Sequence, residues 1–202
     1  MKKIMSCVML LISHMAFAEG ASELLQAKLN ALRTMNANFT QVVTAKHREV
    51  SHSSGTMALS RPGRFRWQTK NPMQQVVIAD GKRLWVYDVD LEQVSVKKQE
   101  KSVGGTAGLF LSGYNDSVAH DFDVSVIEKG NKLSFDLNAK SNKANFQRVK
   151  LVFEGVALRG IALYDQLGQV TNVTLNQVQV NPKLASSLFQ FKAPRGVDVV
   201  EQ

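Results

Sequence analysis

The sequence of 202 residues predicts a mainly β fold with few helices, built on one large antiparallel sheet. Roughly eleven short segments rich in Val, Thr and aromatic residues follow one another, most of them without a helical pattern between neighbours. In several segments apolar and polar residues alternate, which gives a strand one apolar face and one hydrated face. Because neighbouring strands twist against one another, a sheet of that length should curl.

The N-terminus has the pattern of an export signal. Two lysines precede an apolar stretch over residues 4–12, and Ala16-Phe17-Ala18 offers small residues at the cleavage position. We therefore expect residues 1–18 to be removed and residues 19–202 to form a single domain.

Composition narrows the possible functions. Cys7 is the only cysteine and would leave with the signal, so we expect neither a disulfide nor a thiolate metal site. The net charge falls from +8 to +6 on removal of the signal, because two lysines leave. This excess could attract anionic lipid head groups or acidic partner surfaces, although an unspecialised hydrated surface explains it equally well. Nucleic acid is not an expected partner of an exported protein.

An amphipathic helix is predicted over residues 23–35, with Ser22 as its cap. Leu25, Leu29 and Leu32 recur at helical spacing, so this helix should cover an apolar surface. Predicted strands follow at residues 36–45, 53–61, 64–69, 74–80, 83–88, 92–98, 121–128, 132–139, 146–154, 157–164 and 169–179.

Residues 102–114 interrupt the series of strands. Leu109, Phe110 and Leu111 form an apolar cluster among four glycines, which is typical of a short helical segment. We interpret it as part of a lid, and an ordinary loop with a few residues in the core is an equal alternative. The one-sided strands need such cover, or a hydrophobic ligand, unless the core is fully packed without a cavity.

Arg61 is predicted on the apolar face of its strand, together with Met57 and Leu59. A guanidinium stays charged and is costly to bury without hydrogen-bond acceptors. Arg61 could therefore bond to carbonyls at the edge of an apolar surface, as a polar latch. Alternatively, it ends its strand before Pro62 and reaches into water.

Signals for catalysis and metal binding are weak. His47 and His52 fall in a predicted hairpin loop with no acidic partner nearby. Near His120, strand alternation turns Asp121 and Asp123 towards solvent. The chain has no nucleophile elbow and no phosphate-binding loop. We expect no enzymatic activity, no metal site and no cofactor.

Three stretches carry a resemblance to a known family. They are residues 61–67 (RPGRFRW), residues 80–87 (DGKRLWVY) followed by residues 91–93 (LEQ), and residues 189–197 (FQFKAPRGV). In order and spacing they resemble the LolA family of outer-membrane lipoprotein carriers over essentially the whole chain. The resemblance implies a half-open antiparallel β-barrel of about eleven strands, with a helical lid over a hydrophobic cavity for acyl chains.

The resemblance also implies a role and a set of residues. A LolA-like carrier is a monomeric periplasmic chaperone that accepts acylated lipoproteins from the inner-membrane LolCDE ABC transporter and delivers them to the outer-membrane receptor LolB. By position, Arg61 corresponds to the family arginine that holds the lid shut, and Phe65 to an aromatic residue needed for accepting lipoprotein. Met57, Leu59 and Trp67 are expected to help bind or transfer the lipoprotein. Trp67 and Trp85 correspond to aromatic residues of the family's sheet, for which a core role is favoured over a specific ligand contact. The expected lid residues are Leu25, Leu29, Leu32, Leu109, Phe110 and Leu111.

Arg64 and Arg66 depart from the family pattern, and alternation turns them outward, where they could meet partners. One alternative function is an envelope-stress sensor or regulator of the RseB type, which binds lipid ligands with a similar half-barrel but has an additional C-terminal domain. Another is a tethered receptor like LolB, which requires a cysteine at the signal cleavage site, where this chain has none.

Overall fold

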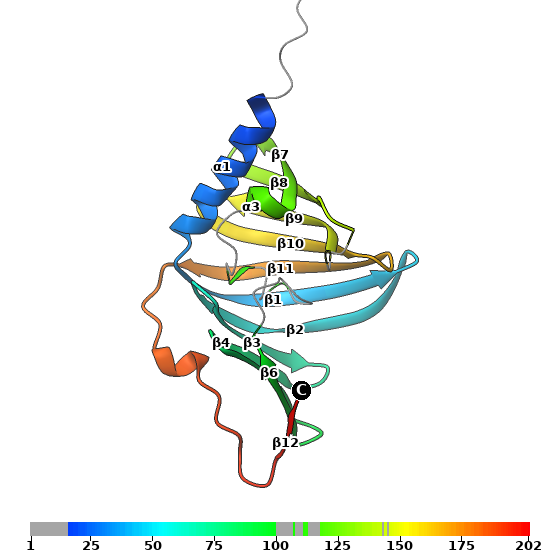
Figure 1. Ribbon diagram of the computed structural model, residues 1–202, viewed down its shortest axis with the longest axis vertical. Coiled ribbons are helices and arrows are strands. Elements are labelled where there is room, and N and C mark those ends of the chain that lie inside the picture. Colours follow the sequence, from blue (N-terminus) through cyan, green and yellow to red (C-terminus); the bar gives the residue numbers. More distant parts are fainter. Residues whose placement is uncertain (1–15, 100–106, 108–110, 113–117, 143, 145) are drawn as a thin grey trace, which may run out of the picture.

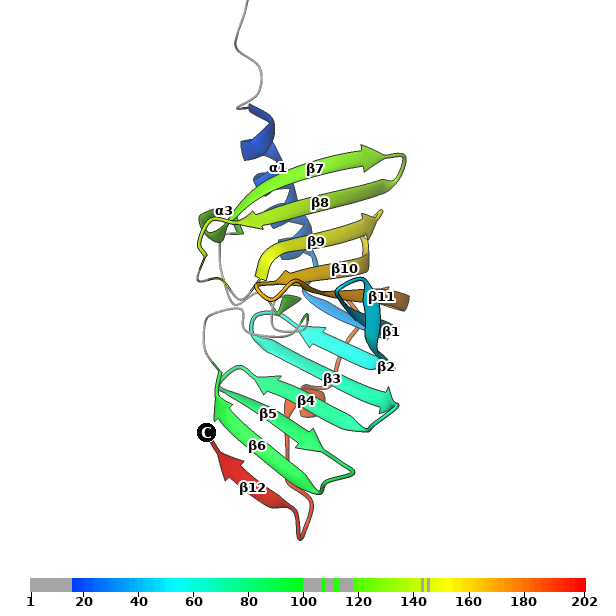
Figure 2. The same cartoon turned by 90° about the vertical axis from the view of Figure 1, so that its right-hand side faces the viewer.

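The computed structural model describes residues 16–99, 107, 111–112, 118–142, 144 and 146–202. In this part of the chain one sheet has the strand order β12-β6-β5-β4-β3-β2-β1-β11-β10-β9-β8-β7. It stays open, because β12 and β7 are its two ends, and it curls into the half-open barrel of Figures 1 and 2. The strands are β1 (Thr34–Ala45), β2 (Arg48–Ser60), β3 (Arg64–Asn71), β4 (Gln75–Asp80), β5 (Arg83–Asp88), β6 (Gln93–Lys98), β7 (Phe122–Lys129), β8 (Lys132–Ala139), β9 (Phe146–Glu154), β10 (Ala157–Asp165), β11 (Gln169–Val180) and β12 (Asp198–Glu201).

Tight turns connect most neighbouring strands, as the sequence predicted. The β4–β5 turn is held by Asp80, whose Oδ1 accepts hydrogen bonds from the backbone N–H of Lys82 (2.8 Å) and of Arg83 (2.7 Å). Gly81 in this turn and Gly130 in the β7–β8 turn have positive φ angles of 95° and 61°, which glycine adopts without steric cost. Each of the eleven predicted strands is present, and the largest boundary error is at β2, which begins at Arg48.

The predicted helix is confirmed, but both of its ends were wrong. Helix α1 spans Ala16–Ala31, so it runs through Ser22 and ends before Met35, which lies in β1. The reason for the early end is Asn181, a residue distant in sequence. Its Nδ2 donates to the carbonyl of Ala31 (2.9 Å), while its Oδ1 accepts from the backbone N–H of Arg33 (2.8 Å). The first bond pairs a carbonyl that the end of a helix leaves unsatisfied, and the second fixes the backbone just after the helix.

Two further short helical elements are described. Helix α3 (Val118–Asp121) leads directly into β7, and a 3₁₀ helix, η1 (Ser186–Phe189), lies in the segment after β11. No helix in the described ranges is long and apolar enough to cross a membrane. Of the segment predicted as a second part of the lid, Ala107 and Leu111 are described and buried, whereas Leu109 and Phe110 lie outside the described residues.

The main core lies on the concave face of the sheet, under α1. Leu25 and Leu29 of α1, and Leu32 just after it, are buried and belong to one apolar cluster with residues from both halves of the curled sheet, and α1 itself packs mainly against β7 and α3. A smaller apolar layer covers the opposite face of β5. There Phe191 stacks on Trp85, with ring centroids 5.3 Å apart, and lies 5.9 Å from Tyr87. The C-terminal segment therefore runs along the outside of the sheet from β11 to β12 (Figure 1).

The twelfth strand was not predicted. β12 pairs with β6 in parallel, with Val199 opposite Val94, and every residue of β12 is exposed. A four-residue strand without a buried face leaves no alternating pattern to detect.

Candidate functional site

The predicted binding residues come together on the concave face. Met57 and Leu59 of β2 and Phe65 and Trp67 of β3 are each at most 8% exposed and belong to one apolar cluster with the leucines of α1. Register explains this, because Leu59 pairs with Phe65, and Met57 with Trp67, so all four side chains share one face.

The concave face is not uniformly apolar. Along β1, Met35 and Phe39 are buried, whereas Gln41, which points to the same face, is half-buried. Trp67 stacks on Phe39, with ring centroids 4.0 Å apart. The apolar part of the interior therefore lies at the end of the strands that α1 covers, and the surface becomes more polar towards the opposite end.

Arg61 joins the sheet to α1. Its Nη1 donates a hydrogen bond to the carbonyl of Leu29 (2.8 Å), and its backbone N–H donates to the carbonyl of Arg33 (2.9 Å). The Leu29 carbonyl belongs to the last turn of α1, where the helix dipole is negative, and it also accepts a hydrogen bond from the backbone N–H of Leu32 (3.2 Å). Burial lowers the pKa of Arg61 from its ordinary value. The guanidinium is thus partly shielded from water and directed at the end of the helix.

A buried glutamine fixes the turn that follows Arg61. Gln99 is 4% exposed, and its Nε2 donates to the carbonyl of Gly63 (2.8 Å), while its Oε1 accepts from the N–H of Gly81 (3.1 Å). The N–H of Gly63 donates to the carbonyl of Ser112 (2.9 Å). Gln99 ties the β2–β3 turn to the β4–β5 turn, a role that sequence reasoning missed because the residue follows two lysines in a polar context.

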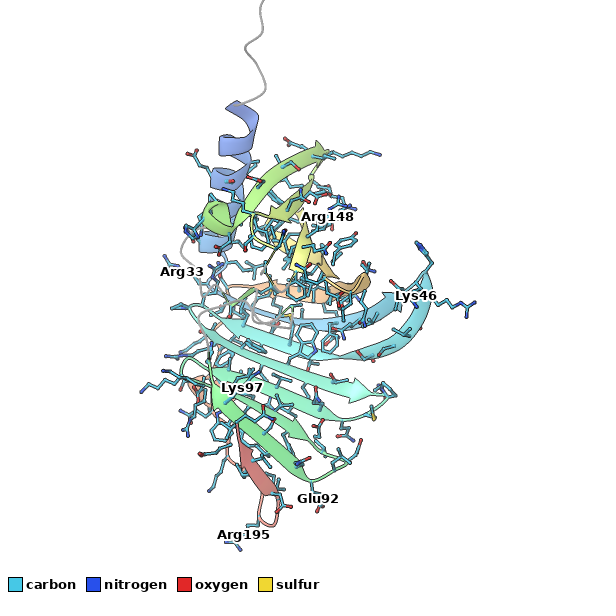
Figure 3. All side chains as sticks on the ribbon, turned by 45° about the vertical axis from the view of Figure 1, so that its right-hand side comes forward. Arg33, Lys46, Glu92, Lys97, Arg148 and Arg195 are labelled. Atoms are coloured by element: carbon cyan, nitrogen blue, oxygen red, sulfur yellow. The ribbon has the colours of Figure 1, made fainter. Side chains whose placement is uncertain are left out.

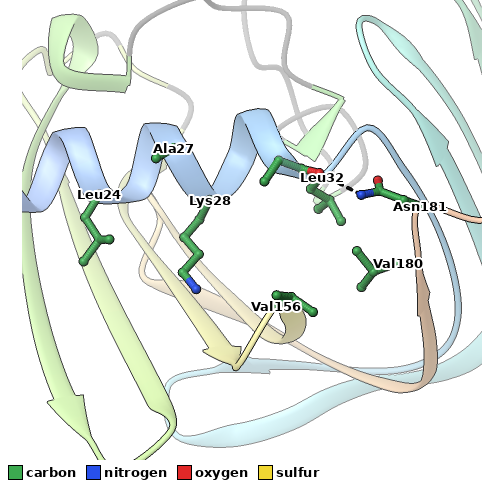
Figure 4. Close-up of a pocket in the computed structure, with 8 residues that line it drawn as sticks. Leu24, Ala27, Lys28, Leu32, Val156, Val180 and Asn181 are labelled. Atoms are coloured by element: carbon green, nitrogen blue, oxygen red, sulfur yellow. Dashed lines mark hydrogen bonds between the residues drawn. The ribbon is translucent and has the colours of Figure 1, made fainter.

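A groove opens along the flank of α1. It has a volume of about 330 Å³, and its lining residues are Leu24, Ala27, Lys28, Ala31, Leu32, Val156, Val180 and Asn181 (Figure 4). Lys28 Nζ crosses to the carbonyl of Gly155 in the β9–β10 turn (3.0 Å). Asn181, which caps α1, also borders the groove, so the contacts that hold the helix in place surround this opening.

The remaining predictions have mixed outcomes. Alternation in β3 is confirmed, since Arg64 is exposed and Arg66 half-buried on the face opposite Phe65. The prediction that His52 lies in a loop without an acidic partner is wrong, because β2 begins early enough to include it and its Nδ1 lies 3.6 Å from Oε1 of Glu49. His47 does lie in the turn.

Within the described ranges, no group of three or more His, Cys, Asp or Glu could hold a metal ion.

This apolar half-barrel with a helix held over it can be compared with known proteins. The model of the family described as outer membrane lipoprotein carrier protein LolA matches residues 30–192. The chain belongs to the LolA family. Two relatives called outer-membrane lipoprotein carrier protein extend the match: one from Legionella pneumophila (strain Corby) is 60% identical over 202 residues, covering 100% of both chains, and one from Dechloromonas aromatica is 34% identical over 201 residues, covering 98% of this chain and 96% of its own.

Solved structures share the fold of this LolA-family chain at low sequence identity. An uncharacterized conserved protein from Thermus thermophilus matches with a TM-score of 0.57 and 13% identity, over 91% of this chain and 99% of its own. MucB matches with a TM-score of 0.50 and 14% identity, over 87% of this chain and 64% of MucB. These similarities show the fold alone.

Proposed function

We propose that this protein is a periplasmic chaperone that carries acylated lipoproteins from the inner membrane to the outer membrane, with the acyl chains shielded against its concave face. The observation that carries the proposal is the continuous apolar surface under α1, formed in a LolA-family chain whose relatives are called outer-membrane lipoprotein carriers. The role requires no chemical step, so the protein acts as a carrier and not as an enzyme.

The physical requirement is to keep acyl chains out of water and still release them. Each CH₂ group exposed to water costs about 0.8 kcal/mol, so a carrier must cover the chains completely. In this structure the leucines of α1 occupy the apolar surface. Cargo must therefore displace α1, and the closed helix competes with cargo when it is released.

Arg61 is the proposed latch for this competition. A hydrogen bond from a charged donor is worth about 1.5–3 kcal/mol, which is enough to favour the closed position of α1 without preventing cargo from opening it. Phe65, Met57, Leu59 and Trp67 would then form the surface exposed to acyl chains, and Leu25, Leu29 and Leu32 the part of the lid that leaves it.

The proposed partners are an inner-membrane LolCDE ABC transporter, which supplies the energy for lipoprotein release, and the outer-membrane receptor LolB. We propose that the carrier works as a monomer, after removal of residues 1–18.

Release of a triacylated lipoprotein from spheroplasts or from transporter proteoliposomes tests the function. With the purified protein present, we expect a soluble one-to-one complex in size-exclusion chromatography; without it, the lipoprotein should stay in the membrane. A lipoprotein without acyl chains is the control and should give no complex. No complex with the acylated form, despite folded protein and a matched transporter, would overturn the proposal and favour the regulatory alternative.

A further inference from the structure

A second pocket lies on the outer face of the sheet, next to the turn that carries Arg61. It has a volume of about 290 Å³. Three exposed cationic side chains, Arg64 of β3, Lys82 of the β4–β5 turn and Arg83 at the start of β5, line it together with Asp80. Ser186, Phe189 and Gln190 of the C-terminal segment form its other wall. Cations are therefore gathered in a concave site and not scattered over a flat surface.

The strand register places two like charges opposite one another in this region. Arg83 of β5 pairs with Lys98 of β6, whereas Arg64 of β3 lies opposite the carboxylate Asp80 of β4. Like charges directly opposite one another in a sheet are destabilising. In the part of the chain that the structure describes, Arg64, Lys82, Arg83 and Lys98 make no ion pair within 4.0 Å, so an anion from outside would relieve the repulsion between Arg83 and Lys98.

Among the described residues that line the pocket, the carboxylate of Asp80 is already engaged. Oδ1 of Asp80 accepts the two turn N–H bonds described above, and its Oδ2 accepts a bond from Nε1 of Trp85 (3.1 Å). Arg83 stacks over the Trp85 ring, with its guanidinium carbon 4.7 Å from the ring centroid. Asp80 thus orders the turn and its cations, and the pocket keeps an excess of positive charge.

We propose that this pocket binds a phosphate group, and that the phosphate belongs to the head group of an anionic phospholipid at a membrane surface. A phosphate carries several oxygens and can accept bonds from two guanidinium groups and an ammonium at once, which suits three cations converging on one concavity. The choice of a lipid source rests on the proposed function, because a carrier that works between two membranes meets such head groups.

The position of the pocket gives it a role in loading or delivery. Arg64 is three residues from Arg61, and the pocket lies at the end of the strands where α1 ends. Figure 3 shows Arg33 and Lys97 towards this end of the molecule, and Lys46 at the tip of the β1–β2 hairpin at the other end. A head group bound here would hold against the membrane the same end of the half-barrel at which α1 covers the apolar interior.

The test is vesicle flotation of the purified protein without cargo. Wild-type protein should float with vesicles of phosphatidylcholine containing about 30% phosphatidylglycerol, and not with phosphatidylcholine alone. The variant Arg64→Gln/Lys82→Gln/Arg83→Gln should lose roughly 10- to 100-fold in binding. Lys46→Gln/Arg48→Gln/Lys70→Gln removes the same charge at the opposite end of the strands and should keep most of the binding. Arg64→Gln alone, at an exposed position, should give a smaller loss and serves if the triple variant does not fold.

Other outcomes would overturn the inference. Equal losses in both triple variants would mean that only net charge matters. An NMR titration with inorganic phosphate, read at the amides of Gly63 and Gly81, separates the source: shifts there without vesicle binding would assign free phosphate. If a Glu-rich peptide displaces the inorganic phosphate and the protein does not bind vesicles, the pocket would be assigned to an acidic protein partner. Because cargo is absent from flotation, failure of the carrier assay leaves this result unaffected, and failure of flotation leaves carrier activity standing.

Discussion

Arg61 is the residue whose contact most directly links this fold to its proposed function. Arg61→Leu removes the bond to the Leu29 carbonyl and should loosen the end of α1. With a charged hydrogen bond worth about 1.5–3 kcal/mol, amide exchange in α1 should accelerate by roughly 10- to 100-fold. The closed state then competes less well, so bound lipoprotein should be released more slowly. Arg61→Lys keeps the charge and should restore part of both effects; normal exchange and release in Arg61→Leu would contradict the latch.

The lowered pKa values of two carboxylates, Asp136 and Asp80, determine how we expect stability to depend on pH. The hydrogen bond from Arg148, aided by the charges of Arg148 and Lys150, outweighs burial and lowers the pKa of Asp136. Burial raises the pKa of Asp80, but bonds from the N–H groups of Arg83 and Lys82 and from Trp85 outweigh it, so its pKa is also lowered. A lowered folded-state pKa stabilises the fold above the unfolded value of about 3.9, and this contribution is lost as pH falls through the folded pKa.

The free energy of unfolding in urea should therefore fall as pH drops below about 4, and Asp136→Asn should flatten that decline. Glu128→Gln, at an exposed position of β7, is the matched control and should leave the decline unchanged. A decline of the same size in Asp136→Asn would show that this carboxylate does not contribute.

At the residue scale, the sequence predicted what depends on alternation and missed what depends on distant partners. Phe65 and Trp67 were correctly placed inside and Arg64 outside, because period-two alternation needs only neighbouring residues. The acceptor of Arg61 could not be found, because it depends on where α1 ends. That end is set by Asn181, which lies 148 residues from Arg33.

Strands β2 and β3 approach each other closely at Gly55. A Cβ at Gly55 would lie 1.9 Å from the backbone oxygen of Gln68 and 3.0 Å from the Phe39 ring. Gly55→Ala should therefore destabilise the protein by about 1–3 kcal/mol in urea unfolding, because the two strands must separate. Gly160→Ala, where the nearest atom would be 3.6 Å away, is the control and should cost less. Equal midpoints for the two variants would contradict the close approach.

Residues 181–202, the C-terminal segment, contain η1 and β12, which the sequence did not predict, and Phe189 is the one buried residue of this segment. Phe189 is buried, whereas Leu188 beside it is 37% exposed. Phe189→Ala should cost about 3–5 kcal/mol if the segment unfolds with the sheet, lowering Tm by roughly 6–20 °C. If the segment detaches alone, limited proteolysis after Asn181 should increase at little cost in Tm. Leu188→Ala is the control and should change neither Tm nor proteolysis. If Phe189→Ala also changes neither, Phe189 does not hold the segment.

At the scale of the whole molecule, the open sheet and its apolar face followed from sequence, but the way the interior is filled did not. The pattern of strands allowed either a cavity or a packed core. The described structure has the leucines of α1 on the apolar face and a groove of about 330 Å³ beside the helix. Strand patterning could not decide this, because it depends on where a helix, packed mainly against β7 and α3, lies over the curled sheet.

Because α1 covers the apolar concave face, acyl chains and α1 cannot occupy that face at the same time. Binding of an acylated lipoprotein should therefore increase hydrogen exchange in α1, while amides in the centre of the sheet, where β1 pairs with β11, keep their protection. Hydrogen exchange followed by mass spectrometry measures both regions in one experiment. Lipoprotein without acyl chains should change neither. Greater protection of α1 in the complex would mean that acyl chains bind beside the helix, in the flanking groove, and not in its place.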